Sequence, residues 1–134
     1  MKRVYKMDAS GKTSLVAGTG QEWGPGDPRW YLGDGGPALD ACLNNPTSIA
    51  VDSAGNLYIA DTGNKAIRKV DTRGIISTIA GGGYLGTASS EGGPARDAAL
   101  VGPCAIRLDS AGNIYFCDVS NVSETGALIR KLYK

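Results

Sequence analysis

DGGPALDACLNNPTSIAVDSAGNLYIADTGN, residues 34–64, returns 57 residues later as EGGPARDAALVGPCAIRLDSAGNIYFCDVSN, residues 91–121. Seventeen of the 31 aligned positions are identical, which indicates an array of one repeated unit. A repeat of this length buries its hydrophobic face only by stacking on further copies. The sequence therefore says more about how the molecule is assembled than about what it binds.

The repeat is typical of four short strands joined by tight turns. In the first copy each candidate strand is rich in Ile, Val and Tyr and is bounded by Gly, Asn or Asp. The candidates are residues 47–52, 56–61, 66–71 and 75–80. The second is almost continuously apolar, which indicates burial on both faces. Gly55 and Gly74 can supply the positive φ that the connecting turns require. Such a meander predicts one blade of a β-propeller.

The ends of the chain extend this pattern. Residues 4–18 match residues 67–81 and supply a third and a fourth strand, whereas residues 128–134 resemble the third strand. With the strands of a blade named a to d, the order is c-d, a-b-c-d, a-b-c, or nine strands where two blades need eight. We therefore predict an all-β fold of four-stranded antiparallel blades, about two per chain.

The predicted organisation is one propeller segment over residues 1–134. It comprises strands c-d at 3–18, a full blade at 34–81 and a partial a-b-c blade at 91–134. Between blades, residues 38–43 and 95–100 are expected to form a short helical turn that packs its leucine on the blade.

Composition excludes several classes of function. Lys and Arg number 14 against 13 Asp and Glu, so no nucleic-acid partner is expected. The short basic clusters, at residues 2–3, 65–69 and 130–131, are interpreted as solvated strand edges. The chain has no histidine, which removes the commonest general base and the commonest transition-metal ligand. No apolar run is long enough to span a membrane. The charged start MKRVYKMD shows no signal peptide, which leaves the cytoplasm as the default compartment.

The three cysteines, Cys42, Cys104 and Cys117, have no CxxC spacing, so they do not indicate a zinc site. Their odd number also fits poorly with a disulfide framework. We interpret them as small buried hydrophobes, with a Cys42–Cys104 pair as the alternative.

Residues 46–71, PTSIAVDSAGNLYIADTGNKAIRKVD, resemble the NHL repeat, and the preceding GDGGPA, residues 33–38, resembles the spacer of bacterial NHL-repeat proteins. The likeness covers nearly the whole chain. The second copy departs from it where Val119-Ser120 replaces Thr62-Gly63 and a five-residue insertion follows. NHL proteins are typically six-bladed propellers, so the resemblance implies a ring that two blades alone do not close.

We therefore expect a homotrimer that forms one six-bladed ring, in which the first c-d hairpin of one chain completes the a-b-c strands of the next. This strand exchange leaves the ninth strand to be displaced. The alternatives are a longer six-bladed gene product that contains this segment, and four chains in an eight-bladed ring.

A binding face is predicted from the differences between the copies. Only the d–a and b–c connectors vary in length, and in an up-and-down blade both leave the same rim. Variable loops on a rigid frame are where proteins place recognition. Four aromatic residues gather in these connectors: Trp23, Trp30, Tyr31 and Tyr84. They predict a face for a protein or small-molecule ligand, although they could instead cover the propeller or seal a joint between chains.

Repeated Asp and Asn residues are interpreted as structural residues of the turns: Asp52, Asn56, Asp61, Asn64, Asp109, Asn113, Asp118 and Asn121. The alternative is a ring of carboxylates for Ca²⁺, although no single copy concentrates the oxygen ligands that this ion needs. No catalytic residue, metal ligand or cofactor site is predicted. The resemblance leaves open a Ca²⁺-dependent hydrolase or lyase whose site is shared between chains. The favoured function is a non-catalytic scaffold.

Overall fold

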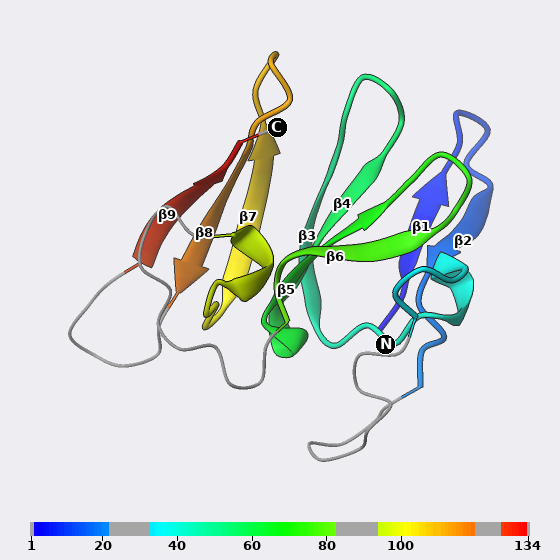
Figure 1. The fold of residues 1–134 in the computed structure, drawn as a ribbon. Helices are drawn as coiled ribbons and strands as arrows, with labels where there is room; N and C mark the ends of the chain where they lie inside the picture. Colours follow the sequence, from blue (N-terminus) through cyan, green and yellow to red (C-terminus); the bar gives the residue numbers. More distant parts are fainter. Residues whose placement is uncertain (1, 22–32, 83–93, 120–126, 134) are drawn as a thin grey trace.

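The computed structural model describes residues 2–21, 33–82, 94–119 and 127–133. Within them the chain forms nine strands: β1 (Val4–Met7), β2 (Thr13–Ala17), β3 (Pro46–Val51), β4 (Leu57–Asp61), β5 (Ala66–Val70), β6 (Ile76–Gly81), β7 (Pro103–Leu108), β8 (Ile114–Val119) and β9 (Ala127–Leu132). Three antiparallel sheets, β1-β2, β3-β4-β5-β6 and β7-β8-β9, stand side by side (Figure 1). The predicted all-β fold and the predicted strand order are confirmed.

The middle sheet shows why one repeat cannot stand alone. All five residues of β4 are buried, as predicted for a strand that is covered on both faces. Leu57 and Ile59 pack in one hydrophobic cluster with residues of the first hairpin, whereas Tyr58 and Ala60 pack in a second cluster with residues of β7 and β8. Alternate side chains of one strand therefore bind the two neighbouring sheets.

The turns between strands have the predicted chemistry. Gly55 lies at φ +91° and Gly74 at φ +82°, a region in which residues with a Cβ are strained. The Asp52 backbone nitrogen donates to the Asn56 oxygen at 3.0 Å and closes the a–b turn. The DSAGN sequence forms the corresponding turn again in the second copy, from Asp109 to Asn113.

The connector that precedes the middle sheet lies between two blades. Its Gly35 and Ala38 backbone nitrogens donate to the Ile76 and Gly74 oxygens, at 2.8 Å each, so the connector first pairs with the outer strand. It then forms the one-turn 3-10 helix η1 (Ala38–Asp40) and buries Leu43. The corresponding segment before β7 forms η3 (Ala95–Asp97) and buries Leu100. The predicted helical turns with their packed leucines are confirmed.

Two interpretations of the cysteines are wrong. Cys42, Cys104 and Cys117 are free thiols, so Cys42 and Cys104 do not pair. Each of them is half-buried rather than buried. Cys104 lies opposite Cys117 across β7 and β8. No helix in the described ranges is long and apolar enough to cross a membrane.

Gly81, at the end of β6, lies where two neighbouring blades approach each other closely. Its φ is +67°, and an added Cβ would meet the Lys65 carbonyl oxygen and come within 2.7 Å of Leu100. Gly74 has a similar φ of +82°, but nothing lies within 4 Å of its Cβ position. We expect Gly74→Ala to destabilise the fold by about 1 kcal/mol through backbone strain alone, and Gly81→Ala to cost clearly more. Urea unfolding of both variants measures the difference, and equal losses would contradict this account.

Candidate functional site

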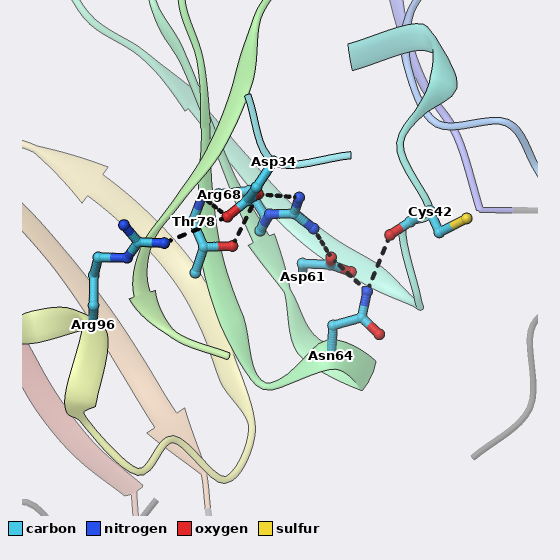
Figure 2. Close-up of polar contacts among 7 residues, drawn as sticks. All are labelled: Asp34, Cys42, Asp61, Asn64, Arg68, Thr78 and Arg96. Carbon is cyan, nitrogen blue, oxygen red and sulfur yellow. Dashed lines mark hydrogen bonds and ion pairs between the residues drawn. The ribbon is translucent and has the colours of Figure 1, made fainter. Parts of the chain in front are cut away.

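A buried arginine links the middle sheet to the connector that crosses it (Figure 2). The Arg68 side chain extends from β5 and is completely buried. Its Nη1 donates to Asp61 Oδ2 at 3.3 Å, and its Nη2 donates to Asp34 Oδ1 at 2.7 Å. One guanidinium group therefore pairs with two carboxylates, one from the neighbouring strand β4 and one from the connector.

Asp34 also joins two further parts of the chain. Its Oδ2 accepts a hydrogen bond from the Thr78 backbone nitrogen at 3.0 Å, and its Oδ1 accepts one from Thr78 Oγ1 at 3.2 Å. Arg96, in the connector before the next blade, lies 3.7 Å from Asp34 Oδ2 (Figure 2). The Asp of the spacer GDGGPA thus fastens its connector to β6 and reaches the following connector.

Asp61 is the last residue of β4 and is completely buried. Burial raises the pKa of its carboxyl group, and the hydrogen bonds and the Arg68 cation oppose that shift. The Asn44 backbone nitrogen donates to Asp61 Oδ1 at 2.7 Å, and Asn64 Nδ2 donates to Asp61 Oδ2 at 2.8 Å. Asn64 also donates to the Cys42 backbone oxygen at 3.2 Å. Asp61 and Asn64 together thus hold the backbone of the connector against the end of β4.

The second copy contains a looser version of the same network. Asp118, which corresponds to Asp61, accepts hydrogen bonds from the Val101 and Gly102 backbone nitrogens at 2.9 and 2.8 Å. Arg130 Nε donates to Asp118 Oδ2 at 3.0 Å. The Arg130 side chain is 28% exposed, whereas that of Arg68 is 0% exposed, so the outer strand β6 is part of what buries Arg68.

The interpretation of residues 65–69 as a solvated strand edge is wrong at Arg68. The short run of positive charges suggested solvent exposure for all of residues 65–69, although the Arg68 side chain points between the sheets. A signal was present, since both copies place Arg in the third strand, in AIRKVD and in LIRKLY. A charge that recurs at one register position of a buried strand indicates a buried partner of opposite charge.

The repeated DSAGN turns lie on the opposite rim. Asp52 Oδ2 accepts hydrogen bonds from Asn56 Nδ2 at 2.8 Å and Tyr58 Oη at 3.1 Å. In the second copy, Asp109 accepts the same bonds from Asn113 and Tyr115, at 2.8 and 3.2 Å. A hollow of about 480 Å³ lies between the two turns. The carboxylates that line it are already engaged by their own turns.

The aromatic residues of the predicted binding face, Trp23, Trp30, Tyr31 and Tyr84, lie outside the described residues, as does Asn121. The binding face therefore stays a prediction. In the described ranges, no group of three or more Cys, Asp or Glu side chains is placed to hold a metal ion. The structure does not gather the four repeated aspartates into one cluster. Asp52 and Asp109 directly follow β3 and β7 at one rim of the sheets, whereas Asp61 and Asp118 lie near the ends of β4 and β8 at the other rim.

The two outer faces of the sheet stack expose apolar residues at positions that the middle of the stack buries. Ile49 of β3 and Ile106 of β7 correspond in the repeat, yet Ile49 is 46% exposed and Ile106 is 0% exposed. Ile106 is covered by the middle sheet, and its backbone nitrogen donates a hydrogen bond to Ser48 Oγ at 3.1 Å. On the first hairpin, Tyr5, Met7 and Leu15 are exposed as well.

Comparison with known families gives one match. The model of the Teneurin NHL domain matches residues 1–91. Among curated proteins, teneurin-3 of Mus musculus is 42% identical over 94 residues, 65% of this chain, and teneurin-1 of Gallus gallus is 40% identical over 91 residues, 63% of this chain. The matched segment spans about 3% of the length of each of these relatives.

Solved structures with the same fold include bacterial proteins. A protein of unknown function from Bacteroides thetaiotaomicron is 27% identical with a TM-score of 0.70, and the match covers 97% of this chain and 29% of that one. An auxiliary nutrient binding protein from the same species has a TM-score of 0.60 at 20% identity, over 95% of this chain and 31% of that one. The second likeness shows the fold alone.

Removal of Arg68 should be far more damaging than removal of Arg130. Arg68→Ala leaves a fully buried Asp61 without its cation, and breaking a buried pair in this way costs about 3–5 kcal/mol. Arg130→Ala should cost less, because Asp118 keeps two backbone donors and Arg130 is partly exposed. Urea unfolding compares the two variants. Adding Asp61→Asn to Arg68→Ala should recover part of the loss, and no recovery would argue against an uncompensated charge as its cause.

The aspartates of the turns have lowered pKa values, so we expect the fold to lose stability in acid. The Asn56 side chain lowers the pKa of Asp52 from its ordinary value of 3.8 to about 2. Asp8, Asp71 and Asp109 are shifted in the same direction by hydrogen bonds in their own turns. A carboxylate whose folded pKa is lowered stabilises the fold above its unfolded pKa, and this stabilisation is lost as the pH falls from about 4 to 2.

The urea midpoint should therefore fall across this range, and Asp52→Asn should show a smaller fall than the unchanged chain. Asp40→Asn is a matched control, since Asp40 lies in η1 outside these turns. An equal pH dependence in Asp52→Asn and the unchanged chain would contradict the assignment.

Proposed function

The chain belongs to the Teneurin NHL domain family, and from this premise we propose that it is a non-catalytic propeller scaffold that self-associates to close a ring of blades. The open faces of its first and last sheets are the surfaces through which it does so. The partner that covers them is a second copy of the same chain.

The observation that carries this proposal is the unequal burial of equivalent residues. Ile106 is completely buried because two inner strands, β3 and β4, stand in front of it, and Ile49 is 46% exposed where the described residues place no inner strands. The sheet β7-β8-β9 begins with two such inner strands, and its outward face is open. One end of the chain therefore carries the element that the other end lacks.

The repeat itself supports the fit between the two ends. Tyr58 and Ala60 of the middle sheet cover β7 and β8, and the corresponding residues of the last sheet are Tyr115 and Cys117. Both of these residues are half-buried. Placed against Ile49 of another copy, they would repeat a contact that the chain already makes within itself. Covering one large apolar side chain contributes about 1.5–3 kcal/mol, so several such positions offset the cost of association.

The contact is heterologous, since the surface at one end of the chain meets a different surface at the other end. Such contacts form closed rings when the rotation between copies divides a full turn. Two blades per chain and six blades per ring, the number typical of NHL proteins, give three chains. Four chains in an eight-bladed ring, or blades supplied by a longer parent protein, would cover the same faces.

The proposed non-catalytic role is the one expected for a member of the Teneurin NHL domain family. The described residues do not gather the oxygen ligands of a Ca²⁺ site, so the Ca²⁺-dependent hydrolase or lyase has no observation in its favour. Recognition of a protein or small molecule by the connectors around residues 22–32 and 83–93 remains part of the proposal.

Light scattering of the purified chain at micromolar concentration tests self-association. We expect a mass of about 41 kDa, three times the 13.8 kDa of one chain. Ile49→Asp should yield monomers, because it places a charge in the contact, while Thr72→Asp, in an exposed turn, is the matched control and should not change the mass. A monomeric wild-type chain would refute self-association and favour blades from a longer parent, and 55 kDa would indicate four chains.

A further inference from the structure

β1 and β9 are the same strand of the repeat. Residues 4–7 correspond to residues 67–70 of β5, and residues 129–132 correspond to them as well. In a ring of two-blade chains, the blade shared between copies takes strands a and b from β7 and β8 of one copy, and strands c and d from β1 and β2 of the next. β9 and the partner copy's β1 then require the same place beside β8.

The structure shows which of the two strands is better anchored as strand c. Val4 of β1 is 7% exposed, because it packs in the cluster formed with the middle sheet. Ile129, the corresponding residue of β9, is 77% exposed. β1 is also paired with β2, whereas within the described residues β9 has β8 as its only strand partner. At this register position, the strand already in place is therefore the less covered of the two.

β9 pairs with β8 along six residue pairs, Leu132 packs against the cluster of β7 and β8, and two polar side-chain contacts add to this pairing. Arg130 Nε donates to Asp118 Oδ2 at 3.0 Å, and Lys131 Nζ lies 5.2 Å from the centre of the Tyr115 ring. Lys131 is exposed and the Arg130 side chain is 28% exposed, although Asp118 is buried, so we expect both contacts to be weaker than those of the fully buried Arg68. When Arg130 leaves, Asp118 keeps its hydrogen bonds from Val101 and Gly102. The corresponding residue of β1 is Tyr5, which offers one hydroxyl donor at that register position.

We propose that β9 is an intrachain cap on assembly, which occupies the edge of β8 in the free chain and is replaced there by β1 of a second copy when the ring closes. This inference rests on the proposed self-association and names its mechanism, because the edge of β8 becomes the site at which two copies exchange strands. The Arg130–Asp118 contact is the latch of the cap.

The register of β8 and β9 allows the cap to be locked reversibly in the full chain. Cys117 lies directly opposite Ile129, so Ile129→Cys places two thiols on neighbouring strands. Cys42→Ala and Cys104→Thr remove the other thiols and introduce the residues that the other copy of the repeat has at these positions, Ala99 and Thr47. Oxidation with glutathione disulfide joins the two remaining sulfur atoms, with two glutathione thiols as the reduced product, and intact-mass spectrometry verifies the bond through the loss of two hydrogen atoms.

We expect this triple variant to be monomeric by light scattering when oxidised and to assemble after reduction with dithiothreitol. The Cys42→Ala/Cys104→Thr variant, which keeps Ile129, should assemble under both conditions. An oxidised triple variant that assembles like its reduced form would overturn the cap and leave self-association intact. If the unchanged chain and both variants are monomeric under every condition, self-association itself fails and the cap falls with it.

A second variant tests the latch without new cysteines. Arg130→Ala should lower the concentration at which half of the chains are assembled severalfold, because it loosens β9 and leaves the contacts of β1 untouched. Lys12→Ala, in an exposed turn of the first hairpin, is the control for loss of a positive charge and should leave that concentration unchanged. Weaker assembly in Arg130→Ala would show that β9 belongs to the assembled ring and would overturn the inference.

Discussion

Each blade of this chain has two apolar faces, and neither face can be left in water without cost. β4 displays the constraint most directly, because Leu57 and Ile59 pack toward the first hairpin while Tyr58 and Ala60 pack toward the last sheet. A blade is consequently stable only between two other blades. In this chain the middle sheet alone meets that condition, and the outer sheets expose residues that the repeat elsewhere buries. The proposed self-association would cover these exposed residues.

Apolar stacking is not directional, so it does not set the spacing of the blades. The Asp34–Arg68–Asp61 network supplies directed contacts that do. The network lies in the layer between two sheets and ties the connector to β4, β5 and β6 through directed hydrogen bonds. A buried guanidinium without partners would be costly, so the connector is held wherever both carboxylates can reach it. The spacer sequence is therefore a structural part of the blade beside it.

The strands, their order and the turns could be predicted because each depends on local sequence: strand residues, a glycine at a position of positive φ, and a second copy of the repeat against which to compare them. The burial of Arg68 depends on what the neighbouring connector places beside it, so only the recurrence of Arg in the third strand of both copies signals it. Cys117 shows the same limit. Its burial depends on a blade that is not its own, and the equivalent Ala60 is covered while Cys117 is half open. Local pattern predicts the blade, and only the packed structure shows its contacts.

The ninth strand follows from the same balance. An inner strand such as β8 with a bare edge presents unpaired backbone groups, which invite indiscriminate pairing with other chains. A strand that covers this edge protects the free chain, but a strand packed as well as β5 could not be replaced. β9 meets both requirements, since it completes the backbone pairing of β8 along six residue pairs while Ile129 remains largely exposed. In the proposed assembly, the strand that exceeds the count of eight protects the free chain and is replaced by β1 of a second copy when the ring closes.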